Sequence, residues 1–500
     1  MALMVMRGLP EKLYFCGSSG PVCRTWHRKG EHRLKTEKSM TMAKDKPGIP
    51  KGTRDFDPLE ISRRELIFDT IRETYRMHGF RPIETPAMEN LSTLTGKYGE
   101  EGDRLIFRVL NSGDFPSKVD DAEWQSKNPQ RLAARISDKA LRYDLTVPFA
   151  RYVVQHQHHI VFPFKRYQMQ PVWRADRPQK GRYREFFQCD ADVIGSDSLF
   201  NEAEFFQIID KVFSQLNIDV RILVNNRKIL AGVAEYIGFP HKMGLITTAI
   251  DKLDKVGLDQ VLDELARGGI TVEALEKLNP LLQLSGSNDE KMAFLSDLLK
   301  DSETGTRGVE EVREMLDIIA VTPLHCELVL DLSLARGLDY YTGAIIEVKA
   351  LDVEMGSLCG GGRYDDLTGI FGLNDVSGVG ISFGADRIYD VMLALERFPD
   401  ITGTFSQLLA INFGPKERNY CLPALENLRS IGVQCEMYPE PAKLKKQMQY
   451  ADKNSIPFVL MAGEEEMKRQ VFSLKDMRSG DQQELMLEQI SDVLMKYIER

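Results

Sequence analysis

The chain has 500 residues, 43% of them hydrophobic and 28% charged, so it is not a disordered protein as a whole. Its length suggests about three domains. Its longest apolar runs fall well short of the roughly 18–20 residues of a membrane-spanning helix, which argues against an integral membrane protein. Seven scattered cysteines without a C-x-x-C pair argue against a disulfide scaffold or a structural zinc site and favour a reducing, cytoplasmic location.

The net charge of −9 is unevenly spread. Residues 1–46 carry ten basic and four acidic side chains, so the remaining chain carries −15. We interpret residues 1–46 as a disordered or targeting-like extension, either a transit peptide or a dispensable tail. The acidic remainder disfavours non-specific binding of nucleic acid but not a specific RNA partner held by local basic patches.

The first ordered part begins near Pro50. Residues 62–78 have helical periodicity and predict an amphipathic helix, which Gly79 would end. Residues 81–86 contain two prolines and are predicted to be extended at a sheet edge. The polar stretch 111–138 predicts a long loop or a small insertion.

Residues 165–174 and 182–194 predict a β-hairpin. Side chains of equal parity share one face of a strand, and in the second strand these are Arg182, Arg184, Phe186, Gln188, Asp190 and Asp192. Arginine, ring, amide and carboxylate suit a ligand with phosphate, a ring and an amine, because arginine donates two parallel hydrogen bonds to phosphate. A salt-bridged, solvated face explains the pattern equally well.

The rest of the chain divides into three sections. A helix is predicted at 201–216, and helical periodicity continues through 225–320, which we interpret as a separate insertion. Strands are predicted at 329–334, 344–348 and 378–383, followed by a helix at 385–395. From residue 405 onward strand-like and helical runs alternate, which indicates a small α/β domain.

Several nucleotide-site and hydrolase motifs are missing. There is no G-x-x-x-x-G-K-[ST] loop, no dinucleotide-binding glycine pattern, no G-x-S-x-G and no H-E-x-x-H. The cluster His156, His158 and His159 is more typical of a surface than of a metal site. Two other stretches could carry chemistry: the turn Arg336–Gly343 between strands, and the strand-to-helix junction ending at Arg387, where a helix N-terminus beside an arginine favours an anion.

Taken together, these stretches resemble the histidyl-tRNA synthetases, a family of class II aminoacyl-tRNA synthetases. Residues 50–55 (PKGTRD) resemble the family's opening. Glu84-Thr85-Pro86 resembles motif 1, residues 164–195 motif 2 and residues 378–387 motif 3. Residues 334–343 and 359–365 resemble the two stretches peculiar to the histidine enzymes.

The resemblance implies an α+β fold: a six- or seven-stranded antiparallel sheet flanked by helices, a helical insertion and a C-terminal α/β anticodon-binding domain. It places the catalytic domain at 47–224 and 321–400, the insertion at 225–320 and the anticodon-binding domain at 405–500. It also implies a homodimer that activates L-histidine with ATP and Mg²⁺, without a protein cage for the metal, and then esterifies the 3′ end of tRNA(His).

The resemblance also implies roles for single residues. Those expected to bind histidine are Asp144, Leu145, Thr146, Arg174, Gln188, Asp192, Arg336, Tyr340, Tyr341 and Tyr364. Those expected to bind ATP are Arg174, Arg182, Phe186 and Arg387. Arg336 and Arg174 are the expected catalytic residues. No general base is required, because the α-carboxylate of histidine is already ionised at neutral pH, so catalysis would rest on positioning and electrostatics.

Two alternatives belong to other functional classes. A non-catalytic regulatory subunit of an ATP phosphoribosyltransferase would resemble the catalytic core but is expected to lack the C-terminal domain and the Arg336 stretch, both of which are present. A class II synthetase for threonine or proline is expected to lack residues 334–343 in this form. In the C-terminal section the local basic candidates for RNA binding are Lys443, Lys445, Lys446, Lys468 and Arg469, each of which could equally be a solvated helix face.

Overall fold

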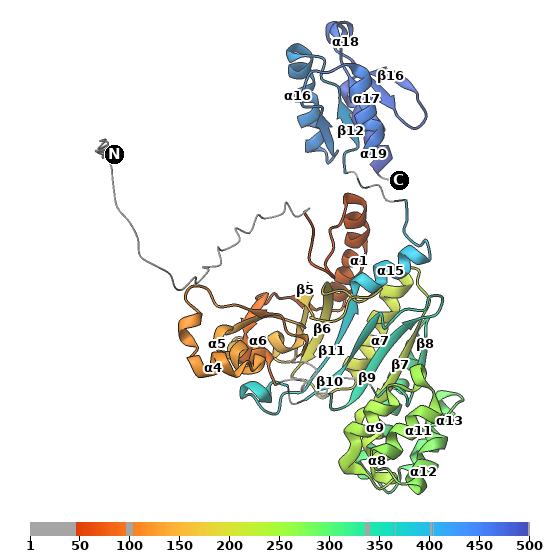
Figure 1. The fold of residues 1–500 in the computed structure, drawn as a ribbon. Helices are drawn as coiled ribbons and strands as arrows, with labels where there is room; N and C mark the ends of the chain where they lie inside the picture. Colours follow the sequence, from red (N-terminus) through yellow and green to blue (C-terminus); the bar gives the residue numbers. More distant parts are fainter. Residues whose placement is uncertain are drawn as a thin grey trace, which may run out of the picture. The chain divides into compact units, whose positions relative to one another are not determined.

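The computed structural model describes residues 47–96, 104–335, 341–365, 367–400, 403 and 405–498 (Figure 1). Its main sheet has eight strands in the order β1-β5-β6-β11-β10-β9-β7-β8. Neighbours from β5 to β7 are antiparallel, whereas the edge strands β1 and β8 run parallel to β5 and β7. The bounds are β1 Arg81–Pro82, β5 Phe164–Trp173, β6 Glu185–Ile194, β7 Val220–Asn226, β8 Glu327–Leu330, β9 Ala344–Ala350, β10 Cys359–Tyr364 and β11 Gly378–Gly384.

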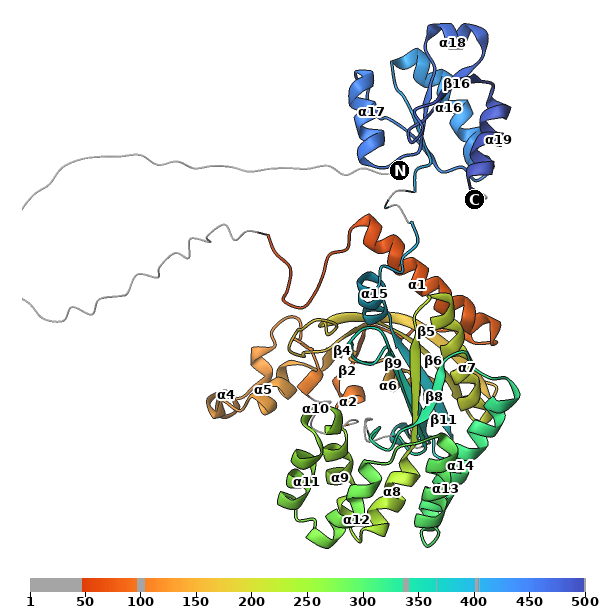
Figure 2. The ribbon, with the colours of Figure 1, turned by 90° about the vertical axis from the view of Figure 1, so that its right-hand side faces the viewer.

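Three helices pack on one face of this sheet, α1 (Pro58–Met77), α7 (Phe200–Gln215) and α15 (Ala385–Ala394) (Figures 1 and 2). The alternation of β6 explains the packing, since its odd-numbered residues Cys189, Ala191 and Val193 are buried in the same apolar core as these helices. The even-numbered residues of β6 face the other side, and the central ones, Gln188, Asp190 and Asp192, are polar. One sheet therefore separates a hydrophobic core from a polar face.

Both ends of helix α1 are fixed by capping interactions of residues that can be recognised in the sequence. Asp57 caps its N-terminus and forms a reciprocal capping box with Glu60. Gly79 has φ of +79°, and its N–H bonds to the carbonyl of Arg76 just past the C-terminus. The predicted helix at 62–78 is confirmed, with four further residues at its start.

A smaller subdomain precedes the hairpin. Its three-stranded sheet has the order β2-β4-β3, and the stretch predicted as a loop or small insertion contains short helices. The elements are β2 Met88–Asn90, α2 Leu91–Leu94, β3 Arg108–Val109, the 3₁₀ helix η1 Pro116–Lys118, α4 Asp121–Ser126, α5 Pro129–Ile136, β4 Lys139–Leu141 and α6 Thr146–His156.

The section between β7 and β8 is helical, as predicted (Figure 2). Its helices are α8 Arg227–Tyr236, α9 Met243–Ile250, α10 Leu253–Val256, α11 Leu258–Arg267, α12 Val272–Leu282, α13 Asn288–Leu298 and α14 Glu303–Val321, with the 3₁₀ helix η2 Pro240–Lys242. Helix α14 packs on both α7 and α8. The approach of α8 to α14 is close because glycines face each other at Gly232 and Gly305.

Residues 405–498 form an α/β domain with a mixed five-stranded sheet, order β13-β12-β14-β15-β16. Both faces of this sheet are covered, because Leu408 and Leu460 pack with residues of α16 and α19 while Leu409 and Val459 pack with Ala451 of α17. The bounds are β12 Leu408–Ala410, α16 Pro415–Ser430, β13 Cys435–Met437, α17 Leu444–Lys453, β14 Phe458–Met461, α18 Glu464–Arg469, β15 Phe472–Asp476, β16 Gln482–Leu485 and α19 Leu487–Ile498.

The expected architecture is present with two differences. The main sheet has eight strands rather than six or seven, because the parallel edge strands β1 and β8 extend an antiparallel centre of six. The second hairpin strand begins at Glu185 rather than at residue 182. The five cysteines in the described part of the chain are free thiols, and no helix described there is long and apolar enough to cross a membrane.

The glycine contact between α8 and α14 gives a stability prediction. A Cβ at Gly232 would lie 2.5 Å from the Cα of Gly305, so Gly232→Ala should lower the free energy of unfolding by about 1–3 kcal/mol through overpacking. Gly244 of α9 is the matched control, since a Cβ there meets nothing within 4 Å and Gly244→Ala should be neutral or stabilise by up to about 1 kcal/mol. Urea unfolding measures both; equal effects would contradict the packing argument.

Candidate functional site

The polar face of the main sheet is organised by the strand register. Arg166, Asp192, Gly380 and Gly362 lie side by side across four strands, and the neighbouring row contains Gln168, Asp190, Ser382 and Gly360. These residues come from four separate segments of the chain. The antiparallel register is what brings motif 2 and motif 3 together with the glycine cluster at residues 360–362.

A buried ion pair lies at the centre of this face. An Nη2 of Arg166 is 2.6 Å from Oδ2 of Asp192, and both side chains are almost fully buried. Tyr364 donates its hydroxyl to the other oxygen of Asp192. Burial raises the pKa of Asp192, while Arg166 opposes that rise. Asp192 and Tyr364, both expected to bind histidine, are thus in direct contact.

Glycines of β10 and β11 line the sheet surface beside these groups. A Cβ at Gly380 would overlap the carboxylate of Asp192, and a Cβ at Gly362 would overlap the backbone of Ala344 and the ring of Tyr341. A Cβ at Gly360, by contrast, would come no closer than 3.5 Å to its nearest neighbour. At these glycines the polar face consists of backbone atoms without side chains, and this allows Asp192, Tyr341 and Tyr364 to pack closely against it.

Asp190 is a second buried carboxyl on this face. It lies between Gln168 and Ser382 in its row, and its Oδ1 is buried without a hydrogen-bond partner. Burial raises its pKa to about 7, and the neighbouring carboxylate of Asp192 adds to the rise while Arg166 opposes it. Sequence analysis placed Asp190 on this face but did not select it. The alternation that points to Gln188 and Asp192 selects Asp190 as well.

Arg142 holds the segment that carries Asp144, Leu145 and Thr146. It is fully buried and donates to the carbonyls of Thr85 at 2.5 Å and Pro171 at 3.0 Å and to Oε1 of Gln170 at 3.0 Å. Its burial lowers its pKa to about 10. Asp144 is buried just before α6, and its charge adds to the raised pKa of Asp190, which places it near the polar face.

The hairpin loop at residues 174–184, called here the phosphate loop, contains the arginines expected to meet ATP. Arg174 donates through Nε to the carbonyl of Tyr143 at 2.9 Å, and its guanidinium lies 5.1 Å from the ring centroid of Phe186. Arg182 pairs with Asp176 at 2.9 Å and is half-exposed. Arg387, from the first turn of α15, donates to the carbonyl of Gly181 at 2.9 Å. The loop therefore contacts α15 through Gly181 and Arg387, next to Arg182 in the chain.

The structure corrects the predicted strand face for two of these arginines. Arg182 and Arg184 precede β6 and so do not share its pleat with Phe186, Gln188 and Asp192. The N–H of Arg184 bonds to the carbonyl of Gly52 at 2.8 Å instead of to a hairpin partner strand. Gln188 is where alternation predicts it, with its amide donating to Ser382 at 2.9 Å.

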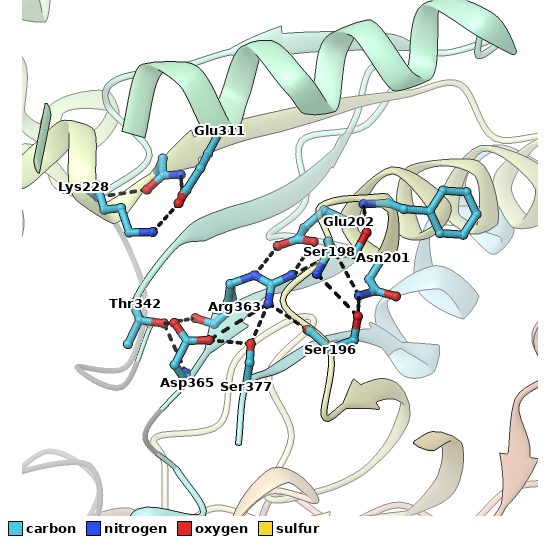
Figure 3. Close-up of polar contacts among 12 residues, drawn as sticks. Ser196, Ser198, Asn201, Glu202, Lys228, Glu311, Thr342, Arg363, Asp365 and Ser377 are labelled. Carbon is cyan, nitrogen blue, oxygen red and sulfur yellow. Dashed lines mark hydrogen bonds and ion pairs between the residues drawn. The ribbon is translucent and has the colours of Figure 1, made fainter. Parts of the chain in front are cut away.

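A second buried network lies on the opposite side of β10 (Figure 3). Arg363 donates to both carboxylate oxygens of Glu202 at 2.6 and 2.7 Å and to the hydroxyl of Ser377 at 2.6 Å. Ser377 in turn donates to Asp365, which accepts from Thr342 at 2.5 Å. Both Arg363 and Glu202 are buried.

This network positions two tyrosines on the polar face. Thr342 follows Tyr341, and its N–H donates to the carbonyl of Arg363 at 2.9 Å, while Arg363 precedes Tyr364 in β10. This hydrogen bond between the two segments therefore fixes the positions of Tyr341 and Tyr364 relative to each other. Arg336 and Tyr340 lie outside the described residues, so their expected roles stay predictions.

The Arg363–Glu202 pair gives a matched stability experiment. Glu202→Gln leaves a buried guanidinium without its counter-charge and should lower the free energy of unfolding by on the order of 3–5 kcal/mol. Glu327→Gln, which breaks the exposed pair with Arg221 between β7 and β8, should cost roughly 1 kcal/mol or less. Urea unfolding with unchanged m-values would show the difference; similar losses would contradict the importance of the buried pair.

Asp190 gives a pH prediction. Between its unfolded pKa near 3.8 and about 7 the folded chain keeps the proton that the unfolded chain releases, so this carboxyl lowers stability as pH rises through that window. Asp190→Asn should therefore match wild type near pH 4 and exceed it at pH 8 by on the order of 2–4 kcal/mol. Unfolding curves from pH 4 to 8 test this, and a pH-independent difference would contradict it.

Comparison with known proteins gives a consistent family. Residues 136–388 match the family model for histidyl-tRNA synthetase, and residues 407–497 match the model for an anticodon binding domain. The histidine–tRNA ligase of Bacteroides fragilis is 58% identical over 90% of this chain and 99% of its own length. That of Porphyromonas gingivalis is 60% identical over 88% of this chain and 97% of its own.

A solved structure agrees. The histidyl-tRNA synthetase of Nostoc sp. PCC 7120 superposes with a TM-score of 0.76 at 32% identity, covering 90% of this chain and 99% of that one. The chain therefore belongs to the histidyl-tRNA synthetase family.

Proposed function

We propose that the polar face of the main sheet and the phosphate loop form the site where this chain ligates histidine to tRNA. L-Histidine and ATP react there to give histidyl-adenylate and pyrophosphate, and the histidyl group then passes to the 3′ end of tRNA(His). The observation that carries this proposal is the shared location of a carboxylate–tyrosine cluster and a set of anchored arginines within one family fold.

The carboxyl side of the site suits the amino acid. Asp144 with Thr146 would hold the α-ammonium group, beside Leu145, because a carboxylate favours a cation. Gln188 and Asp192 would contact the amino-acid portion, and Tyr341 and Tyr364 would close on the imidazole together with Tyr340. Such paired polar groups reject analogues that leave them unsatisfied, which would provide selectivity for histidine.

The arginine side suits ATP. Phe186 would stack on the adenine, Arg182 and Arg387 would meet the outer phosphates, and Arg174 would bridge the histidine carboxylate and the α-phosphate. Arg336 would neutralise charge at the α-phosphate during attack. Because the attacking carboxylate is already ionised, these residues need only align it and disperse developing negative charge.

Mg²⁺ fits this arrangement as a companion of ATP. Among the residues that the structure describes there is no group of three or more His, Cys, Asp or Glu side chains that could hold a metal. Mg²⁺ commonly binds through substrate phosphates and retained waters, and there it would neutralise phosphate charge. The residues of the chain would then contribute arginines rather than metal ligands.

The C-terminal domain would bind the tRNA. Lys468 and Arg469 are engaged with Glu465 and Glu484, which makes them weaker candidates for phosphate contacts. Lysines 443, 445 and 446, at the start of α17, are exposed and are the better candidates. We further propose a cytoplasmic homodimer with motif 1 at its interface.

A regulatory subunit of an ATP phosphoribosyltransferase remains the competing proposal. The Bacillus halodurans structure whose printed title names such a subunit together with histidyl-tRNA synthetase superposes with a TM-score of 0.66 at 19% identity, a likeness of fold alone. The domain at 407–497 favours the ligase, since an anticodon-binding domain has a use only if tRNA binds.

Histidine-dependent exchange of pyrophosphate into ATP tests the proposal. The purified chain should catalyse exchange, and Arg174→Ala and Arg336→Ala should each slow it by about 10²–10³-fold, because an arginine that stabilises transition-state charge contributes on that scale. The exposed Arg221, paired with Glu327 on β7 and β8, provides the control variant Arg221→Ala. Absence of exchange in wild type would favour the regulatory alternative, and full-rate variants would refute the assigned roles.

A further inference from the structure

Residues 50–54 are called here the strap, and apart from the bond between Arg184 and Gly52 they have not entered the description of the site. The strap crosses the phosphate loop, which is distant in sequence. The carbonyl of Gly52 accepts from the N–H of Arg184 at 2.8 Å, and the carbonyl of Lys51 accepts from Nη1 of Arg184 at 3.4 Å. The strap thus supplies the backbone partner for Arg184 just before β6 begins.

The crossing is close enough to require glycine. Gly52 has φ of +91°, and a Cβ there would lie 2.8 Å from Cγ of Pro178 and 2.9 Å from Cγ of Arg184. Both neighbours belong to the phosphate loop. Thr53 closes a turn onto the carbonyl of Pro50 through its N–H at 3.1 Å and its hydroxyl at 2.8 Å, which fixes the shape of the strap itself.

Arg54 connects the strap to the phosphate loop and to helix α15, the two elements that carry the arginines proposed to bind ATP. Its guanidinium lies 3.5 Å from the ring centroid of Tyr183 in the phosphate loop and forms an ion pair with Asp386 in the first turn of α15. The Tyr183 hydroxyl donates to Asp390 of α15 at 3.0 Å. Burial raises the pKa of Tyr183 to about 12, so it remains a neutral donor.

Asp386 is the anchor of this arrangement. Its carboxylate, almost fully buried, also pairs with the buried Arg64 of α1 and accepts from the N–H of Phe187 in β6 at 2.9 Å. Two arginines and a backbone N–H from three segments therefore meet on one carboxylate. Because α1 and β6 belong to the main core, Arg54 is tied to the rigid part of the fold.

We propose that the strap positions the phosphate loop for ATP, with Arg54 as the positioning residue. The inference rests on the proposed function, because the loop carries Arg174 and Arg182 and touches Arg387. The strap holds the loop from one side through Gly52 and Arg54, and Arg387 holds it from the other through Gly181. Loss of Arg54 would disorder the part of the loop around Tyr183 and Arg182 in a larger share of the molecules, while Arg174 keeps its own anchor on the carbonyl of Tyr143, so the cost falls mainly on ATP and not on histidine.

Full-length Arg54→Ala, Arg54→Lys and the control Arg221→Ala test the proposal in the exchange reaction. Arg54→Ala should raise the KM for ATP by about tenfold or more while the KM for histidine changes by less than about twofold. Arg54→Lys keeps the charge but loses the planar stack and should lie between. Arg221→Ala should match wild type. Equal rises in both KM values, or no rise in either, would overturn the proposal.

Limited trypsin digestion supplies a readout independent of activity. In Arg54→Ala, cleavage after Lys180, Arg182 and Arg184 should speed up by about tenfold, because local opening exposes the loop, whereas Arg221→Ala should be cut as wild type. Unchanged cleavage of the loop in Arg54→Ala would overturn the proposal that the strap holds the loop in place. If wild type lacks exchange, the proposed function fails, while the digestion still decides whether the strap holds the loop.

Discussion

The buried charge of Arg166 constrains the whole polar face. A guanidinium removed from water must be paired, and Asp192 pairs it at 2.6 Å across the β5–β6 ladder. Asp190, two residues earlier on the same face, adds a second carboxyl to a single arginine. Burial raises the pKa of Asp190 to about 7, so this carboxyl keeps its proton to a higher pH than a carboxyl in water. In the proposed function, the sheet centre would accept the ammonium group of histidine.

Carboxylates that bind arginine also join the segments around this centre. Asp192 connects neighbouring strands, Asp386 gathers α1 and the strap onto α15, and Glu202 fixes β10 to α7. In each case a buried or nearly buried carboxylate joins segments that are distant or reversed in the chain. Buried pairs of this kind contribute little net stability, but removal of one partner is costly.

Sequence reasoning reached the parts of this site that follow from local rules. The alternation of β6 predicted that Gln188, Asp190 and Asp192 share a face, and periodicity with Gly79 predicted α1. It failed where a segment distant in the chain supplies the backbone hydrogen bonds. The N–H of Arg184 bonds to Gly52, more than a hundred residues away, and β6 therefore starts three residues later than predicted. The bounds of the edge strands β1 and β8 differ from the predicted ones for the same reason: only two residues of the extended stretch predicted at 81–86 pair in the sheet, and β8 begins at residue 327 rather than 329. Two and four residues long, they are defined by their partners rather than by their own pattern.

The arginines of the phosphate loop are oriented by contacts within the chain itself. Arg174 and Arg182 are each anchored through Nε, to the carbonyl of Tyr143 and to Asp176. A guanidinium carries five N–H donors, so an anchor on Nε fixes the plane of the fork and leaves the Nη edge suited to phosphate. Arginines that are already oriented in the folded chain do not need to reorganise, at a cost in free energy, when the reaction takes place. In the proposed mechanism, which uses no general base, the rate would depend on such orientation, so contacts remote from the reacting atoms would contribute to it.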